Sequence, residues 1–375
     1  MSVQTPSPLL DHCPPTLPQA AYIDQGWYDR EMATIWRKNW VYAGRKDAFE
    51  SGSMTRRQVG GVEVIVVADT AGALSAFHNT CRHRGAALCT AESEMIGKLI
   101  RCPYHAWAYA PDGRLVSTGY GTPTRDFDKG AHGLYPVSLF EWNGMVFLNL
   151  DETPEPLSPD MGLAALDNWP MDRLVTGHVF EKELACNWKI FWENYNECLH
   201  CPGIHPELCD MVPVYREGVM SEAERVPREG QAAHAPMKQG ARSWTMSGAP
   251  CGPDFPGLTA EERALGFFFV TCYPSAFIVA HVDYVRVVSL QPLGPQKTRL
   301  RAEWLFAPET MEAPGFDLAN VVDFATLVMQ QDGDACELNQ RGLASPAYTA
   351  GRLMPQEFDI YRFHQWVLAQ MGEEV

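Results

Sequence analysis

Two short segments in the first third of the chain each place one cysteine close to one histidine. The first holds Cys81 and His83, and the second, after eighteen intervening residues, holds Cys102 and His105. Each spacing allows a thiolate and an imidazole to project from one tight turn, so two facing turns would supply two sulfur and two nitrogen ligands. Such a set could hold zinc, or a [2Fe–2S] cluster in which two histidines replace two cysteines on one iron.

The way these ligands are divided between the two segments favours the iron–sulfur cluster. A structural zinc site of this composition usually pairs cysteine with cysteine and histidine with histidine. Here each segment carries one of each, so each would send its cysteine to one iron and its histidine to the other. A zinc-binding structural protein, which would be colourless, is the alternative. Cys89, between the two segments, is predicted to be a buried thiol.

A second group of metal-ligand residue types lies between residues 187 and 206. His200 and His205 flank Pro202-Gly203, which is expected to end a helix. With one carboxylate, two such imidazoles would form the facial triad of non-haem iron enzymes, which leaves positions open for O₂. The spacing leaves the carboxylate undecided among four acidic residues: Glu197, Asp332, Asp334 and Glu337.

The segment before these histidines has helical periodicity. Residues 188–199 are predicted as one helix that buries an apolar face ending at Leu199. Glu193, Glu197 and His200 stand at positions i, i+4 and i+7, which places them together on another face of the same helix. This arrangement predicts that both acids lie near the metal-binding histidines.

Other elements of the sequence indicate what positions these residues. A helix is expected at 24–39, and short apolar runs separated by glycine and asparagine turns over 40–151 indicate a small all-β domain. Strands are expected at 282–290 and 298–306, and a long helix at about 318–339. The chain therefore combines a β-rich first half with a mixed second half.

Composition limits the classes of protein to consider. The 375 residues suggest two domains, and no run of 18 apolar residues is present. A net charge of −16 argues against nucleic acid or an anionic membrane surface as a partner. The N-terminus lacks a basic segment followed by an apolar one, so the cytoplasm is the expected location. In that reducing compartment, the eleven cysteines are expected to be free thiols or metal ligands.

In order and spacing, the two motifs resemble the catalytic α subunit of the Rieske non-haem iron oxygenases, the aromatic ring-hydroxylating dioxygenase α-subunit family. The resemblance extends from about Trp27 to Gly342. It implies the following metal ligands: Cys81, His83, Cys102 and His105 for the [2Fe–2S] cluster, and His200, His205 and Asp332 for the mononuclear iron. It also implies that Glu197 is the acid that bridges the two metal centres during electron transfer.

The assignment of Asp332 rests on its place in the family pattern. It stands five residues before Glu337, which begins a Glu-x-x-Gln-Arg-Gly run. Two departures weaken this match: Gln331 occupies a position that is often acidic in relatives, and Gly333 would weaken a regular helix. Asp334 is therefore kept as an alternative ligand.

The resemblance further implies an α+β fold. An all-β Rieske [2Fe–2S] domain would be inserted in a catalytic domain whose antiparallel sheet wraps round a long helix, as in helix-grip folds. The expected domains are an N-terminal arm and helix at 1–39, belonging to the catalytic domain, the Rieske domain at 40–155, and the catalytic iron domain at 156–375. An acidic, proline-rich linker is expected at 152–159.

The implied function is that of the terminal oxygenase of a multicomponent system. An NAD(P)H-dependent flavin or iron–sulfur reductase, or a ferredoxin, would supply electrons, and O₂ would be used to hydroxylate or N-demethylate a small molecule. The family also implies a homotrimer in which a cluster and an iron of neighbouring subunits work together. A Rieske electron carrier without catalytic iron is a second alternative, and it predicts no metal in residues 160–375.

The substrate class is indicated by a shorter match. The run Asn194–Cys201 resembles relatives that oxidise quaternary ammonium compounds such as carnitine, glycine betaine and stachydrine. A cationic substrate would favour an aromatic cage, for which several residues are available: Trp192, Trp244, Phe267, Phe268, Phe269 and Tyr273. Oxygenation of an aromatic ring or aromatic acid is the alternative, and an acid would favour an arginine such as Arg286 in the pocket. The resemblance itself assigns no substrate-binding residue.

Overall fold

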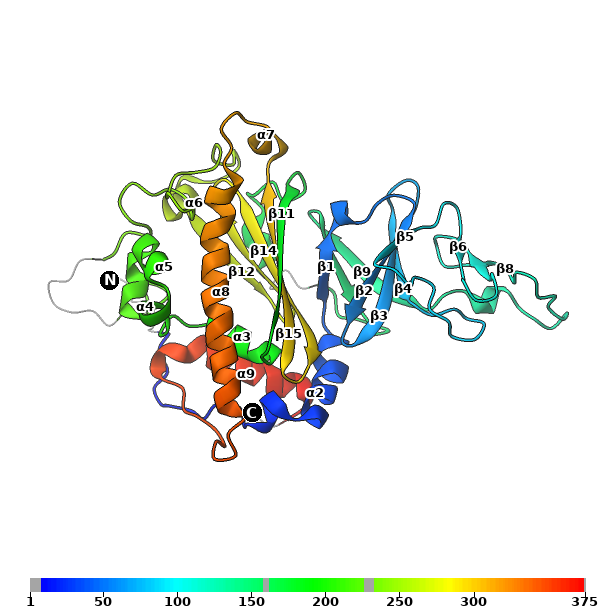
Figure 1. Cartoon of the computed structure of the whole chain (residues 1–375), viewed down its shortest axis with the longest axis horizontal. Helices are drawn as coiled ribbons and strands as arrows, with labels where there is room; N and C mark the ends of the chain where they lie inside the picture. Colours follow the sequence, from blue (N-terminus) through cyan, green and yellow to red (C-terminus); the bar gives the residue numbers. More distant parts are fainter. Residues whose placement is uncertain (1–7, 158–161, 226–232, 374–375) are drawn as a thin grey trace, which may run out of the picture. The chain divides into compact units, whose positions relative to one another are not determined.

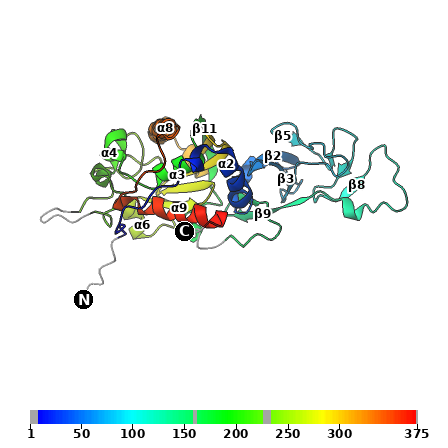
Figure 2. The ribbon, with the colours of Figure 1, turned by 90° about the horizontal axis from the view of Figure 1, so that it is seen from below.

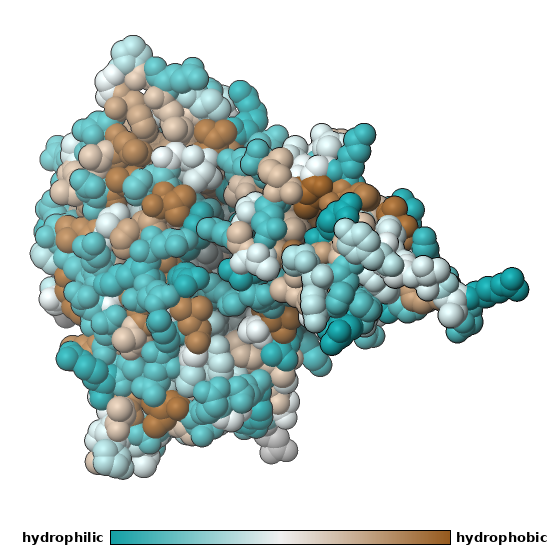
Figure 3. All heavy atoms as spheres, turned by 45° about the vertical axis from the view of Figure 1, so that its right-hand side comes forward, coloured by the Kyte–Doolittle hydropathy of each residue, from teal (hydrophilic) through white to brown (hydrophobic). Residues whose placement is uncertain are grey.

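The computed structural model describes residues 8–157, 162–225 and 233–373. Among these residues, no helix combines the length and the hydrophobicity that a membrane span requires. On the face shown in Figure 3, hydrophobic residues occur in scattered groups among hydrophilic ones.

The chain folds as two compact units. The inserted unit comprises Trp36–Met161 together with the short stretch Cys272–Ala276. The main unit is built from three stretches of chain: Met1–Ile35, Gly162–Thr271 and Phe277–Val375. An all-β unit is thus inserted in an α+β unit, which confirms the predicted fold class. The domain boundaries at 39/40 and 155/156 stay a prediction, and the last two residues of the predicted linker lie outside the described residues.

The inserted unit contains two sheets. Seven strands form the larger one, in the order β1-β10-β9-β4-β3-β2-β5: β1 (Val41–Arg45), β2 (Ser53–Val59), β3 (Val62–Ala68), β4 (Leu74–His78), β5 (Ser93–Met95), β9 (Pro136–Trp142) and β10 (Met145–Asn149). The smaller sheet has three short strands: β6 (Ile100–Arg101), β7 (Ala108–Tyr109) and β8 (Leu115–Ser117). The second Cys/His segment is the connection between β6 and β7, so the small sheet fixes its two ends.

The main unit is centred on a five-stranded sheet in the order β11-β15-β14-β13-β12. Its strands are β11 (Val175–Leu184), β12 (Phe267–Cys272), β13 (Ala276–His281), β14 (Val285–Gly294) and β15 (Lys297–Phe306). β14 and β15 form an antiparallel hairpin in which Val285 pairs with Leu305 and Gly294 with Lys297. The two expected strands are therefore present: the one predicted at 298–306 is confirmed almost to the residue, whereas the one predicted at 282–290 begins and ends later, at Val285 and Gly294.

The long helix α8 (Leu318–Leu343) lies along this sheet and packs against β11 (Figure 1); Figure 2 shows the same helix end on. One buried face runs along the whole helix, with residues every three or four positions: Val322, Ala325, Met329, Gly333, Cys336, Gln340 and Leu343. Val321 and Phe324 are also buried, near its N-terminal end. The helix continues through Gly333, where a Cβ would lie 2.9 Å from the Leu184 side chain. Glycine at this position lets the helix approach the strand closely instead of breaking it.

The other helical segments of the main unit are shorter. The α-helices are α1 (Ala20–Ile23), α2 (Gln25–Glu31), α3 (Trp188–Tyr195), α4 (Cys201–Ile204), α5 (Pro206–Met211), α6 (Ala260–Leu265), α7 (Pro308–Met311) and α9 (Phe358–Met371). The helix expected at 24–39 is α2 continued by a π-helical turn, Met32–Trp36. The helices α1, α3, α8 and α9 pack together, with α3 in contact with both α8 and α9.

The helix predicted over 188–199 is shorter than expected. α3 begins at the N-cap Asn187 and ends at Tyr195, and Leu199 is 40% exposed instead of buried. Pro202 lies in the first turn of α4, where its missing N–H costs nothing, so it begins a helix instead of ending one. The intervening turn is closed by the Glu197 side chain, which accepts the backbone N–H groups of Leu199 and His200.

A fully buried ion pair anchors α3 to α2. Lys189 Nζ lies 2.6 Å from a Glu31 carboxylate oxygen, and both side chains are 0% exposed. Trp188 and Trp27 donate their indole N–H groups to the same carboxylate, at 2.8 and 3.0 Å. Burial raises the pKa of Glu31 and lowers that of Lys189, and in each case the partner opposes the shift.

Breaking this pair is expected to destabilise the main unit strongly. Lys189→Met would leave the buried Glu31 charge without its cation and lower the free energy of unfolding by about 3–5 kcal/mol. Lys189→Met combined with Glu31→Gln should recover much of the loss, because no uncompensated charge remains. Lys46→Met, which removes an exposed pair with Glu141, should cost about 0–1 kcal/mol. Denaturant unfolding curves would measure all three, and equal losses for Lys189→Met and Lys46→Met would contradict the prediction.

Candidate metal centres and the adjoining pocket

The two Cys/His segments of the inserted unit have the same backbone arrangement. In each, the cysteine N–H donates to the carbonyl five residues on: Cys81 to Ala86 and Cys102 to Trp107, both at 2.8 Å. Each cysteine carbonyl in turn accepts the N–H four residues on, from Gly85 or Ala106. These two residues have φ angles of 78° and 59°, the left-handed conformation that closes such a turn. The two loops therefore hold their cysteines in equivalent positions.

The side chains of these loops separate into a buried and an exposed half. Cys81 and Cys102 are 3% and 2% exposed, whereas His83 is exposed and His105 partly so. The two imidazole rings lie side by side, with 4.7 Å between centroids. Two buried sulfurs and two imidazoles near the surface suit a [2Fe–2S] cluster whose histidine-bound iron faces solvent.

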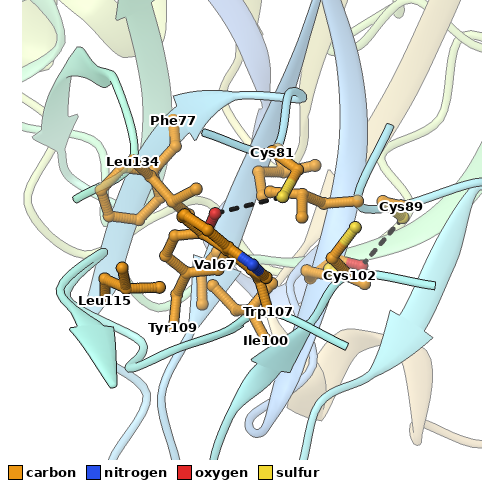
Figure 4. Close-up of a cluster of buried hydrophobic side chains, with 13 residues drawn as sticks. Val67, Phe77, Cys81, Cys89, Ile100, Cys102, Trp107, Tyr109, Leu115 and Leu134 are labelled. Atoms are coloured by element: carbon orange, nitrogen blue, oxygen red, sulfur yellow. Dashed lines mark hydrogen bonds between the residues drawn. The ribbon is translucent and has the colours of Figure 1, made fainter. Parts of the chain in front are cut away.

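Tyr109 closes the buried side of this donor set (Figure 4). Its hydroxyl lies 3.2 Å from Cys81 Sγ and accepts the backbone N–H of Arg82 at 3.0 Å. Hydrogen bonds to the sulfurs are one of the means by which a protein sets a cluster's reduction potential. Cys89 lies in the same hydrophobic core, and its thiol donates to the Ala91 carbonyl. Burial raises the pKa of Cys89 to about 11, as fits the buried thiol that was predicted.

In the main unit, the structure brings His200, His205 and Asp332 together. One ligand atom of each lies within 4.8 Å of the others. His205 Nε2 is 2.8 Å and His200 Nε2 3.4 Å from the same carboxylate oxygen of Asp332. Asp332 comes from α8, one helical turn beyond Val328 and Met329, while the histidines flank α4. Three ligand atoms that converge from two elements fit a metal ion with a facial triad.

The outer nitrogen of each imidazole also has a partner. His200 Nδ1 is hydrogen-bonded to Glu197, and His205 Nδ1 to the Gln331 side-chain oxygen at 2.8 Å. The Gln331 amide in turn donates to Glu207 at 3.1 Å. These bonds orient both rings so that Nε2 faces Asp332, which is how outer partners usually position metal-binding histidines. The side-chain oxygen of Gln331 thus accepts the hydrogen bond from His205 Nδ1 that an acid at this position would accept.

The charges of the site reinforce its geometry. Burial lowers the pKa of His200, but the Asp332 and Glu197 carboxylates outweigh it and raise that pKa to about 9. Burial raises the pKa of Asp332, and the two histidines overcome this effect and lower it below its usual value. The carboxylate is therefore ionised at neutral pH, and the His200 imidazole would release a proton on binding a metal.

Of the other acidic candidates, Glu197 binds the outer nitrogen of His200, and Asp334 and Glu337 lie away from the triad. The Asp334 side chain is 78% exposed and lies 3.4 Å from Lys182. Glu337 accepts the backbone N–H of Ala185 at 3.0 Å. Glu193, expected on the same helix face as Glu197, instead accepts the hydroxyl of Tyr22 at 2.6 Å. That expectation was wrong because α3 ends before Glu197, so helical spacing no longer relates the two acids.

Cys198 and Cys201 form a disulfide on either side of His200. The expectation that all cysteines are free thiols or metal ligands is wrong for this pair. The turn between α3 and α4 places their Cα atoms 5.0 Å apart, within the range that a disulfide spans. The other nine cysteines are free.

A cavity of about 90 Å³ adjoins the triad. Besides the three candidate ligands, aromatic rings make up much of its wall: Phe191, Tyr195, Tyr215, Trp244, Phe269 and Phe277. Pockets for drug-sized ligands measure roughly 300–1,000 Å³, so this one suits a small molecule. The polar groups of the wall include Asn194, whose amide lies 3.4 Å from His200 Nε2, and Arg286 of β14.

The aromatic residues proposed from the sequence for a cage include only some of those that line the cavity. Of the six aromatic residues proposed for a cage, Trp244 and Phe269 line the cavity, whereas Trp192 is fully buried in the core. Phe267 packs on Trp244 with ring centroids 4.7 Å apart, and neither it, Phe268 nor Tyr273 lines the cavity. Four lining rings were not proposed for the cage: Phe191, Tyr195, Tyr215 and Phe277. Tyr195 could have been found, because it stands two residues before Glu197 in the motif.

Two family models match the chain. Residues 39–128 match the Rieske [2Fe-2S] domain, and residues 171–373 match the ring hydroxylating alpha subunit (catalytic domain). The first match contains the four Cys/His residues of the inserted unit, and the second contains the triad and its pocket.

Individual relatives extend over nearly the whole chain. The glycine betaine monooxygenase oxygenase subunit of Chromohalobacter salexigens is 33% identical, over 94% of this chain and 84% of that protein. The chloroplastic choline monooxygenase of Spinacia oleracea is 28% identical, over 94% of this chain and 77% of that protein. A solved quaternary ammonium Rieske monooxygenase has the same fold, with a TM-score of 0.75 and 21% identity over 98% of this chain and 99% of that one.

Proposed function

This chain belongs to the Rieske non-haem iron oxygenases as a catalytic α subunit, and from that premise we propose that it hydroxylates or N-demethylates a small quaternary ammonium compound. The observation that carries the proposal is a small, aromatic-walled cavity opening directly onto His200, His205 and Asp332. Faces of aromatic rings attract quaternary ammonium groups, and the relatives named for glycine betaine and choline act on such compounds.

We propose that the two donor sets hold the two metal centres of the family. Cys81, His83, Cys102 and His105 would bind the [2Fe–2S] cluster, and His200, His205 and Asp332 the mononuclear iron. When bound, these centres supply electron transfer and O₂ activation. The chain itself orients the imidazoles through Glu197 and Gln331, and its aromatic wall gives the cavity a largely apolar surface. A Rieske electron carrier, which would have no metal site in residues 160–375, does not account for this converging triad.

The partners belong to the same proposal. An oxygenase of this family needs a separate reductase or ferredoxin that passes on electrons from NAD(P)H, and the partly exposed histidine side of the Cys/His loops is where we expect those electrons to enter. We also propose a homotrimer in which Glu197 connects His200 to a cluster histidine of the neighbouring subunit. Its support is that Glu197 already holds His200 Nδ1 and keeps 11% of its side chain exposed.

Metal analysis of protein purified without oxygen tests the proposal first. We expect about three irons and two acid-labile sulfides per chain in a red-brown protein. Cys81→Ser should remove the colour and the sulfide, whereas Cys89→Ser, which alters a buried thiol in the same core, should retain both. With a suitable reductase, oxygen consumption should then depend on an added quaternary amine. Zinc without sulfide would contradict the oxygenase assignment, and stimulation by aromatic acids alone would contradict the substrate class.

A further inference from the structure

Arg286 is a buried cation in the wall of the pocket. It lies on β14, is 7% exposed, and lines the cavity beside the triad. Among the described residues its guanidinium group has no hydrogen-bond or ion-pair partner, and its Nε is fully shielded without an acceptor. The other guanidinium groups of this sheet differ: Arg299 and Arg301, on β15, bind acidic side chains.

A guanidinium group in this position is costly to the fold. It carries five N–H donors and no acceptor, and it remains charged at any physiological pH. Burial lowers the pKa of Arg286, and the titratable neighbours that oppose this effect are Tyr284, Tyr195 and Asp332, of which only Asp332 carries a charge at neutral pH. Asp332 is already engaged by the two histidines. The positive charge therefore lacks a counter-ion of its own, and an anion entering the cavity would supply one.

The aromatic rings of the same wall favour a ligand of the opposite charge, a cation. Tyr195 and Phe277 lie with ring centroids 4.1 Å apart, and Tyr195 and Phe269 with centroids 6.2 Å apart. Trp244 continues this surface, 6.0 Å from Phe269. These faces attract a cation, whereas Arg286 repels one and attracts a carboxylate, for which its planar fork is well shaped. A cavity of about 90 Å³ brings both features within reach of one small molecule.

We propose that Arg286 binds the carboxylate of a zwitterionic substrate whose quaternary ammonium group contacts the aromatic wall, so that this enzyme selects betaines over choline. The inference rests on the proposed function and refines its substrate class. Glycine betaine and choline carry the same trimethylammonium group, but choline has a hydroxyl in place of the carboxylate. Arg286 is thus a specificity-determining residue for the end of the substrate that does not react.

Equilibrium binding to the metal-loaded protein without oxygen, measured by calorimetry, tests this role independently of turnover. Three probes separate the charges: glycine betaine has both, choline only the cation, and benzoate only the carboxylate. We expect wild type to prefer glycine betaine, and Arg286→Gln to weaken that binding about 10- to 100-fold, the usual worth of a charged hydrogen bond. Choline binding should not weaken. Arg299→Gln, an exposed change on the neighbouring strand, should leave all three affinities unchanged.

A stability measurement distinguishes a binding role from a structural one. Because Arg286 is an unpaired buried charge, Arg286→Met should melt at a higher temperature than wild type when no ligand is present. Glycine betaine should then stabilise wild type but not the variant. A lower melting temperature for ligand-free Arg286→Met would assign the residue to the fold and overturn the proposal.

The binding outcomes also separate this inference from the proposed function. If wild type binds choline as tightly as glycine betaine, and Arg286→Gln changes neither, the role of Arg286 is wrong while the quaternary ammonium function stands. If wild type binds benzoate but neither ammonium compound, both the zwitterion and the proposed substrate class are wrong.

Discussion

Asp332→Ala is expected to abolish turnover while leaving the visible colour of the protein intact. The side chain supplies the single carboxylate among three converging ligand atoms, so its loss leaves two imidazoles, which hold iron poorly. Iron should fall from about three to about two per chain, with two sulfides retained. Activity should fall by more than the ~10–100-fold that changes in outer partners of a metal site typically cost.

The control for this variant lies two residues further along the same helix. Asp334→Ala removes an exposed carboxylate of equal size whose nearest cation, Lys182, is 3.4 Å away. It should keep the full iron content and nearly full activity, because such surface contacts contribute little. Metal analysis, the visible spectrum and oxygen uptake measure both variants. Loss of colour in Asp332→Ala, or loss of activity in Asp334→Ala instead, would contradict the ligand assignment.

Sequence motifs were most informative where the residue types themselves are rare. The pairs Cys81/His83 and Cys102/His105 could be found without any knowledge of the fold, because each pair lies within one turn. His200 and His205 were found because they stand close together on either side of Pro202-Gly203. The carboxylate could not be chosen by spacing, since more than 120 residues separate it from the histidines. Only the packing of α8 across the sheet, or the resemblance to a family, singles out Asp332.

Sequence reasoning failed where side chains bond to the backbone. Hydrophobic periodicity predicted one helix through Leu199, but the Glu197 carboxylate accepts the N–H groups of Leu199 and His200 and closes a turn there. This turn also brings Cys198 and Cys201 together. A periodic pattern carries no information about such a cap, because the apolar residues keep their spacing on both sides of it.

Most residues of the pocket wall could not be predicted from the sequence, for a different reason. Phe277 and Tyr215 line a cavity, yet their sequence surroundings are those of any buried strand or helix residue. A ring that faces a ligand and a ring that faces the core have the same burial and the same period. Arg286 is the exception. Burying a charge within the strand β14 costs free energy, whereas burying a phenylalanine does not, so an arginine there indicates a function.

Glu197→Gln is expected to keep both metal centres but to slow electron transfer between them about 10- to 100-fold. The amide retains the length of the side chain and one oxygen, which can still accept the backbone N–H groups of Leu199 and His200, so the turn that carries His200 should stay in place. What is lost is the negative charge and one of the two oxygens that now accept N–H groups from Leu199, His200 and the imidazole. If Glu197 also accepts a hydrogen bond from a cluster histidine of the neighbouring subunit, the amide, which has one oxygen, cannot accept hydrogen bonds from both imidazoles as the carboxylate does.

The measurement is a single turnover. Chemically reduced protein is mixed with O₂ and substrate, and the return of the oxidised visible spectrum is followed in time. Glu193→Gln is the matched control: it is the same change four residues earlier, within α3, in a side chain that binds Tyr22 and His364 instead of the site. That variant should lose stability but reoxidise at the wild-type rate. A wild-type rate for Glu197→Gln, with full metal content, would show that electrons reach the catalytic site without this carboxylate.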